Sequence, residues 1–389
     1  MDFKFTDEQI MIRDTAEAFL VKNCPSAAIR QFMDTQLGYD PDFWKRICNE
    51  MCWQGLLIPE NYGGLGLGYV ELVATLEQMG RYLCCSPFYG SICLGVNALL
   101  VAGTEQQKTA FLPQILAGKT ATIAYTSETG GWDSGSVQTS YKKQDNSYCL
   151  NGTYRFVPNG HSADILVLAA REEGTQGEKG ISLFILPAKT SGITREWLPT
   201  IDQTRPQGQV ILNNVILNGD AVMGEQGQAW AELQNILDLA RIGLAAEQLG
   251  GSQQCLDSTL AYITERVQFG RPIASYQAIK HKCADMMVKV EASRSAVYHA
   301  ACVADQFLNQ SEDADALIEA ASIAKAYGSD SFFHNAGVGI QLHGGVGITA
   351  EYDIQLYFKR AKSTEIFLGA PDYHRERLAA LLLDQREVS

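Results

Sequence analysis

The C-terminal part of the chain contains three long stretches with helical periodicity, and this feature limits the possible folds most. The stretches begin "AWAELQNILDLARIG", "SYQAIKHKCADMM" and "DADALIEAASIAKAY". Each continues for about 30 residues or more, and shorter helical runs follow through "EYDIQLYFKRAKSTEIF" and "PDYHRERLAALLL". Long helices joined by short connections favour antiparallel neighbours. The sequence therefore predicts an antiparallel helical bundle from residue 227 to residue 389.

Two different patterns precede this bundle. Thr6-Asp7-Glu8-Gln9 is a capping-box pattern, and apolar residues follow it at helical spacing. From about residue 119 the chain has short β-branched or aromatic runs separated by turn residues: "TATIAYTS", "SYCLNGTYRFV", "ADILVLAAR", "ISLFILPA" and "QVILNNVIL". Within the second run, Asn151-Gly152 predicts a hairpin turn. We expect an α+β chain with a helical domain (1–118), a β domain (119–226) and the bundle (227–389).

Composition excludes several classes of function. The 389 residues carry 31 basic and 44 acidic side chains, so the net charge of −13 argues against a nucleic-acid partner. No cationic leader followed by an apolar segment appears, and no apolar run is long enough to span a membrane, so a cytoplasmic location is expected. The ten cysteines and six histidines lack metal-ligand spacing, which predicts reduced, mostly buried thiols and no metal site.

Two segments resemble the signature regions of the acyl-CoA dehydrogenase family. They are "ERVQFGRPIASYQAIKHKCADM" (265–286) and "IQLHGGVGITAEYDIQLYFKRAK" (340–362). The resemblance covers essentially the whole chain. It implies an N-terminal helical domain, a middle β-barrel or sandwich domain and a C-terminal four-helix bundle. It also implies FAD as cofactor, an acyl-CoA as substrate and electron-transfer flavoprotein as the usual electron acceptor.

The resemblance assigns cofactor-binding positions in this sequence. Arg266 matches the arginine that grips the diphosphate, a task suited to a planar and permanently charged fork. Phe269 matches the aromatic residue that packs on the cofactor. The remaining bundle positions are the glutamine that opens the next helix and the Q-x-x-G-G turn, where backbone comes close to the dinucleotide: Gln277, Gln341, Gly344 and Gly345.

The β domain departs from the family pattern. The usual T-E-P-x-x-G-S-D loop reads "SETGGWDSG" here, so Ser127 keeps a cofactor-binding hydroxyl while Trp132 crowds the glycines. The usual W-x-T-N-G reads Phe156-Val157-Pro158-Asn159-Gly160, and Pro158 offers neither a hydroxyl nor an N–H. We therefore expect weakened contact between this domain and the flavin ring.

Both positions at which the family carries its catalytic base are apolar here. The I-Y-E-G-T stretch reads "IFLGA", which puts Leu368 at the glutamate, and the alternative L-D-L-E-R reads "LDLAR", with Ala240 at the glutamate. Arg241 is retained, and the resemblance gives it a substrate-binding role. Asp238 and Glu365 are the nearest carboxylates in sequence, and we interpret them as solvated or paired helix residues. No catalytic base is assigned in this chain.

The absence of a catalytic base in this chain favours a role as the partner of a catalytic subunit. The chain is similar to the glutamate-lacking subunits of heteromeric bacterial acyl-CoA dehydrogenases of the steroid side-chain type. That similarity predicts a hetero- or homo-tetramer, with a glutamate-bearing paralogue as partner in the heteromeric case. Two alternatives stay open: a self-sufficient flavoenzyme that uses another base or another chemistry, and a flavin-free structural subunit.

Overall fold

The computed structural model describes residues 5–383, which fall into two compact units. One unit, which we call the helical unit, comprises the described residues within 1–31, 69–84 and 241–389. The other, the mixed unit, comprises residues 32–68 and 85–240. Two of the four boundaries between the units fall within helices, α2 (Ser26–Met33) and α7 (Trp230–Glu265). The division into three domains stays a prediction.

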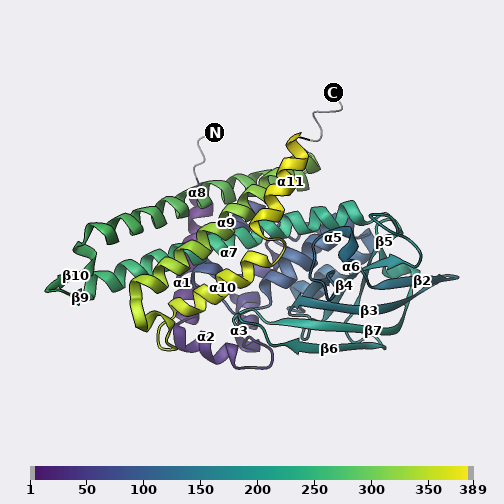
Figure 1. Ribbon diagram of the computed structural model, residues 1–389. Coiled ribbons are helices and arrows are strands. Elements are labelled where there is room, and N and C mark those ends of the chain that lie inside the picture. The colour runs from purple at the N-terminus through teal and green to yellow at the C-terminus, as the bar shows by residue number, and fades with distance from the viewer. Residues whose placement is uncertain (1–4, 384–389) are drawn as a thin grey trace. The chain divides into compact units, whose positions relative to one another are not determined.

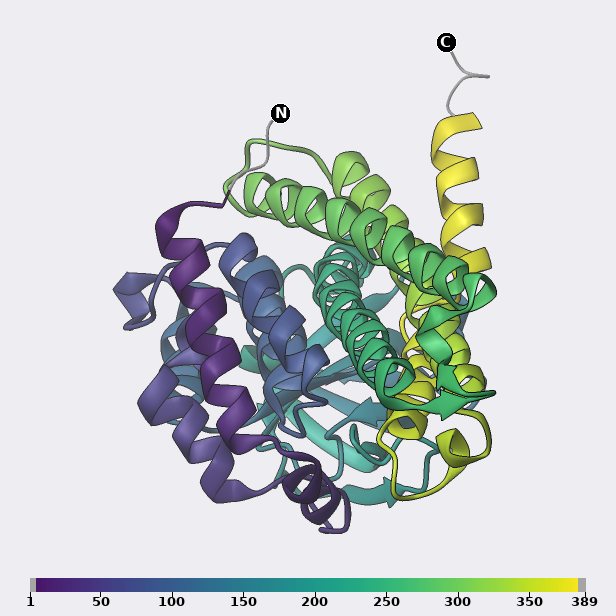
Figure 2. The same cartoon turned by 90° about the vertical axis from the view of Figure 1, so that its left-hand side faces the viewer.

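The helical unit is built around α9, which contacts α8, α10 and α11. Figures 1 and 2 both show α8 and α9 as long helices lying side by side. With α7, they are the three long helices that the sequence predicts, of 36, 32 and 30 residues. The helices wholly within this unit are α1 (Asp7–Asn23), α4 (Tyr69–Arg81), α8 (Gln277–Leu308), α9 (Ala314–His343), α10 (Ile354–Ile366) and α11 (Pro371–Leu383).

Local sequence explains how this unit begins and how its helices approach one another. The Thr6 capping box is confirmed: the Gln9 N–H donates to Thr6 Oγ1 at 3.2 Å, and the Thr6 N–H donates to Gln9 Oε1 at 3.0 Å. At Gly250 in α7, an added Cβ atom would collide with the carbonyl group of Glu77 in α4. Glycine at this position therefore allows the two backbones to pack closely.

The mixed unit contains one eight-stranded sheet and short helices. The strand order is β6-β7-β3-β2-β4-β5-β8, and β1 pairs in parallel with β4. The strands are β1 (Ala121–Ala124), β2 (Ser140–Gln144), β3 (Ser147–Pro158), β4 (Ile165–Glu172), β5 (Ile181–Pro187), β6 (Ile193–Leu198), β7 (Gln207–Asn218) and β8 (Val222–Met223). The helices within this unit are α3 (Pro41–Arg46), α5 (Asn97–Ala102) and α6 (Glu105–Leu116).

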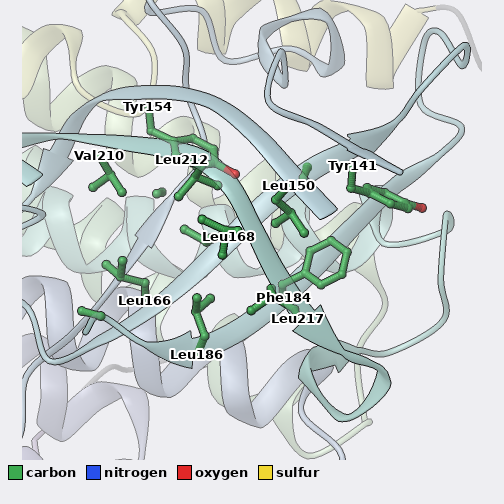
Figure 3. Packing of buried hydrophobic residues seen from close by; sticks show 14 of the residues in the cluster. Tyr141, Leu150, Tyr154, Leu166, Leu168, Phe184, Leu186, Val210, Leu212 and Leu217 are labelled. Atoms are coloured by element: carbon green, nitrogen blue, oxygen red, sulfur yellow. The ribbon is translucent and has the colours of Figure 1, made fainter. Parts of the chain in front are cut away.

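An aromatic and aliphatic core packs against this sheet. Tyr141, Tyr148 and Phe184 meet edge to face, with ring centroids 5.3–5.8 Å apart. Figure 3 shows aliphatic side chains from neighbouring strands around them, including Leu150 and Leu168. Alternate residues of the predicted β runs therefore share one core cluster, and β4 and β5 are buried on their other face as well.

The hairpin turn predicted at Asn151-Gly152 is wrong. β3 runs without a break from Ser147 to Pro158, and its register against β7 shifts between Leu150 and Gly152. The hairpin turn lies at residues 145–146 instead, where Gln144 pairs with Ser147. An added Cβ atom at Gly152 would meet the Thr139 side chain at 2.5 Å. The glycine therefore serves a β-bulge and a close backbone approach within a strand.

The cysteines agree with the sequence analysis. All ten are reduced, and seven of them are buried. Among residues 5–383, no group of three or more histidine, cysteine, aspartate or glutamate side chains is arranged to hold a metal ion. Within the same residues, the helices are too short or too polar to cross a bilayer.

Candidate functional site

The segment from the last turn of α10 to the start of α11, which we call the 368 loop (residues 365–370), holds Leu368 in an uncommon conformation. Leu368 has a φ of +61°, in the left-handed region that non-glycine residues seldom adopt, and its side chain is only 1% exposed. Gly369 follows with a φ of +107°. A Cβ atom at Gly369 would lie 2.5 Å from Tyr373 Cδ1, so this position requires glycine. The expected base position is therefore a buried, tightly shaped turn that carries a leucine.

Buried donors hold the main chain of the 368 loop. Arg241 Nε donates to the Leu368 carbonyl oxygen at 3.0 Å. His374 Nε2 lies 3.1 Å from the same oxygen and therefore carries the proton. Lys325 Nζ donates to the carbonyl oxygens of Gly369 at 2.9 Å and Glu365 at 3.1 Å. These donors come from α7, α11 and α9, so three helices fix one turn.

Several basic side chains lie close to the 368 loop. Burial and the nearby guanidinium of Arg241 lower the pKa of Lys325 to about 7. Burial, with Arg241, Lys325 and Arg377, lowers the pKa of His374 far below its usual range, so this imidazole is neutral. The Tyr373 ring lies against two guanidinium groups, with its centroid 5.8 Å from Arg241 Cζ and 5.9 Å from Arg377 Cζ. The electrostatic environment would favour an anion at this turn.

The second base position is also buried and apolar. Ala240 is fully buried in α7, and its carbonyl oxygen accepts a hydrogen bond from the Tyr89 hydroxyl at 2.8 Å. Asp238, which we expected to be solvated or paired, is fully buried. The Glu365 carboxylate is paired with Lys362 Nζ at 2.6 Å. Glu365 is thus a paired helix carboxylate, as the sequence analysis interpreted it.

The cofactor positions expected in the bundle lie at the surface of the helical unit. Arg266 follows the end of α7 and is exposed, and within the part of the chain that the structure describes it forms no ion pair. Phe269 lies at the turn of the hairpin formed by β9 (Val267–Gln268) and β10 (Arg271–Pro272), and its side chain is 92% exposed. Gln277 opens α8, and its Nε2 lies 3.3 Å from His281 Nε2.

The turn after α9 is open at its surface. Gln341 is exposed near the helix end, and Gly344 has a φ of +65°. Cβ atoms added at Gly344 and Gly345 would meet nothing within 4 Å. With the exposed guanidinium of Arg266 from the same unit, this open backbone fits a cofactor that carries a diphosphate.

The corresponding loops of the mixed unit fit less well. The Ser127 hydroxyl is buried and hydrogen-bonded to Thr129 Oγ1 at 3.2 Å. Phe156 has a φ of +59°, and its ring lies 3.5 Å from where a Cβ atom on Gly130 would stand. Trp132 packs on Tyr125, with ring centroids 6.0 Å apart. Pro158 is buried and has no N–H to donate. The aromatic ring of the family motif is therefore kept, but the donor two residues later is lost.

Sequence reasoning missed three residues of the helical unit that lie behind the 368 loop. They are Gln248, Lys325 and His374, all buried. Gln248 Nε2 donates to the Thr364 carbonyl oxygen at 3.1 Å and to Ser329 Oγ at 3.0 Å. The available signal was a lysine within the small and apolar run "IEAASIAKAYGS", because a charged residue on a buried helix face needs polar partners.

Family models match nearly the whole described chain. The N-terminal domain of acyl-CoA dehydrogenase matches residues 6–119, the middle domain matches residues 122–215, and the C-terminal domain matches residues 227–383. The α+β fold class expected from the sequence is thereby confirmed.

Known proteins agree with these matches. The chain is 32% identical to acyl-CoA dehydrogenase IpdE2 of Mycolicibacterium smegmatis, over 96% of this chain and 99% of that protein. The structure of butyryl-CoA dehydrogenase from Megasphaera elsdenii is 29% identical with a TM-score of 0.90, covering 98% of this chain and all of that one. The steroid ACAD Tcur3481-Tcur3483 is 26% identical with a TM-score of 0.85, covering 98% and 99%.

Proposed function

Because the chain belongs to the acyl-CoA dehydrogenase family, we propose that it is the glutamate-lacking subunit of a heteromeric acyl-CoA dehydrogenase. Family membership makes it an oxidoreductase, and FAD is the cofactor of this family. The reaction is the α,β-dehydrogenation of a CoA thioester. The partner subunit would be a glutamate-bearing paralogue.

One observation carries this proposal: the 368 loop keeps its buried donors but presents a leucine. Removal of an α-proton needs a group that can accept it, and neither Leu368 nor Ala240 can do so. Loss of a general base typically costs about 10²- to 10⁴-fold in rate. A chain that preserves the turn and lacks the base is suited to complete an assembly whose other subunit supplies the carboxylate.

The bundle residues support a cofactor role within this assembly. Arg266 would pair with the diphosphate of FAD, and Phe269 would pack on the cofactor. The other residues that we propose to contact it are Gln277, Gln341, Gly344, Gly345 and, from the mixed unit, Ser127. When bound, FAD supplies the acceptor for the substrate's β-hydrogen. We propose that Arg241 contributes to substrate binding by holding the main chain of the 368 loop.

Similarity to IpdE2 and to a steroid ACAD favours a bulky acyl group of the steroid-derived kind. We propose steroid catabolism as the setting and a heterotetramer as the assembly, with electron-transfer flavoprotein as acceptor. The cytoplasmic location stays a prediction from the sequence.

One alternative is a self-sufficient flavoenzyme with another base or a different chemistry. Two titratable side chains lie near the turn, but Glu365 is paired with Lys362, and the strongly lowered pKa of His374 makes its imidazole a poor proton acceptor. A flavin-free structural subunit is the other alternative, and the buried Pro158 favours it. The open Gly344-Gly345 turn argues for a bound cofactor instead.

Co-expression with a neighbouring glutamate-bearing paralogue tests the proposal. We expect a stable complex of both chains by intact mass, flavin bound to the complex, and dehydrogenation that is absent from this chain alone. A glutamate-to-glutamine change at the base of the paralogue is the control, and it should abolish turnover while the complex remains assembled. Full activity of this chain without a partner would contradict the proposal.

A further inference from the structure

The strongest unexplained feature of the helical unit is a lysine that is buried completely. Lys325 lies in α9 with its side chain 0% exposed. Its Nζ atom has three oxygen neighbours: Ser329 Oγ at 2.8 Å, the Gly369 carbonyl at 2.9 Å and the Glu365 carbonyl at 3.1 Å. None of these three is a carboxylate. Burying a cation without a carboxylate partner costs free energy, so the position of Lys325 calls for a functional explanation.

Two of these three contacts end on the 368 loop. The carbonyls of Glu365 and Gly369 lie on either side of Leu368, so one amine joins the last turn of α10 to the residue after Leu368. The Leu368 backbone itself is in a left-handed conformation that costs free energy for a β-carbon-bearing residue. Such a conformation persists only where the surrounding contacts impose it.

We propose that Lys325 is a positioning residue, which holds residue 368 in its left-handed turn by tying the main chain on both sides of it to α9. It acts through the backbone and touches no substrate. The inference concerns the helical unit of this chain and does not depend on the partner role proposed above. Whatever side chain occupies position 368, glutamate or leucine, the same amine would set its place.

The hydrogen bonds of Lys325 fit this role whether its amine is charged or neutral. An ammonium donates to all three oxygens. A neutral amine still donates to both loop carbonyls and can accept from the Ser329 hydroxyl. The hydrogen bonds from Lys325 to the loop therefore remain when the amine loses its proton, whereas the free-energy cost of burying the charge disappears.

This difference gives the closed loop a pH dependence. The charged groups that act on Lys325 are Arg241 from α7, Glu365 from α10 and Asp330 from α9 itself, and the neutral His374 from α11 lies close to it. Burial lowers the pKa of Lys325 to about 7, whereas an opened loop would return it to the ordinary 10.5. The opened state therefore binds more protons between these values, and closure becomes more favourable as pH rises from 7.

Hydrogen–deuterium exchange of the peptide spanning residues 365–374 tests the proposal in the full chain. Rates are corrected for the intrinsic pH dependence of exchange. In the wild type we expect protection of this peptide to rise about 50-fold between pH 7 and pH 9, because the opened loop binds almost one more proton than the closed loop over most of this range. In Lys325→Met, protection should fall about tenfold at pH 9 and should lose the pH step.

Asn335→Leu is the matched control. Asn335 is buried in the same helix and donates to Ser252 Oγ and to the Met286 carbonyl, both remote in sequence from the 368 loop. This variant should lower overall stability and leave exchange of residues 365–374 at the wild-type level. Equal loosening of that peptide in both variants, or wild-type protection that does not change with pH, would overturn the proposal. If Lys325→Met does not fold, the pH dependence of protection in the wild type tests the proposal by itself.

Discussion

Arg241 and Leu368 lie 127 residues apart in the chain, yet Arg241 Nε donates to the Leu368 carbonyl oxygen at 3.0 Å. Both residues belong to the helical unit and both are buried. In the alignment predicted from the sequence, the contact joins the arginine of the "LDLAR" stretch to the position at which the family carries its glutamate. Arg241 therefore fixes the main chain of the turn that carries Leu368.

The isolated chain should turn over acyl-CoA substrates poorly. Both expected base positions are apolar. Asp238 lies about 200° around α7 from Ala240 and therefore faces another way, and Glu365 is paired with Lys362. A panel of saturated acyl-CoAs with an artificial electron acceptor provides the measurement. Turnover at an ordinary enzymatic rate, about 1–10³ s⁻¹, would show that another residue serves as the base.

Arg266→Ala should reduce the flavin content of the assembled protein severalfold while changing the free energy of unfolding by only about 0.5 kcal/mol. The side chain is exposed, so folding depends little on it. Arg271→Ala is the control, because Arg271 is exposed in the same hairpin but stacks on Tyr276, with Cζ 4.0 Å from the ring centroid. Equal flavin loss in both variants would argue against a specific diphosphate contact by Arg266.

Leu368→Glu should not create dehydrogenase activity in the isolated chain. The new carboxylate would lie near Arg241, which favours its charged form, but it would be buried, and we expect a cost of about 1–3 kcal/mol in unfolding free energy. Phe156 and Pro158 provide no donor for a productive flavin ring. Acyl-CoA-dependent bleaching of bound FAD is the measurement, with Leu368→Gln as the uncharged control. Rapid bleaching in the glutamate variant alone would remove the main support for the partner-subunit proposal.

His374 should make the chain less stable in mild acid. Its folded-state pKa lies well below the usual 6.5 because of burial and the nearby Arg241, so the unfolded chain takes up a proton first as pH falls. Between pH 7.5 and pH 5.5 this histidine should cost about 1–1.5 kcal/mol of unfolding free energy. Denaturant unfolding of wild type and His374→Gln at both pH values measures the difference. Identical pH dependence in the two proteins would mean that His374 is not held neutral.

The sequence alone determined the features that depend on local periodicity and on residue type. Three long helices follow from apolar spacing, and the first helix begins at Asp7, directly after its N-cap Thr6, because the capping box is complete within four residues. The absence of a base at Leu368 and Ala240 also needs no coordinates, because no fold turns a hydrocarbon side chain into a proton acceptor.

Tertiary structure decided the contacts between residues far apart in sequence. Asn151-Gly152 has the local pattern of a turn, but pairing of β3 with β7 makes it a bulge within a strand, because cross-strand packing overrides a two-residue preference. Likewise, nothing in the neighbourhood of Lys325 in the sequence shows its acceptors, which lie 40 and 44 residues further along the chain. Packing of α9 against α10 and α11 brings those carbonyls to the buried amine, and only that packing gives the lysine a role in placing residue 368.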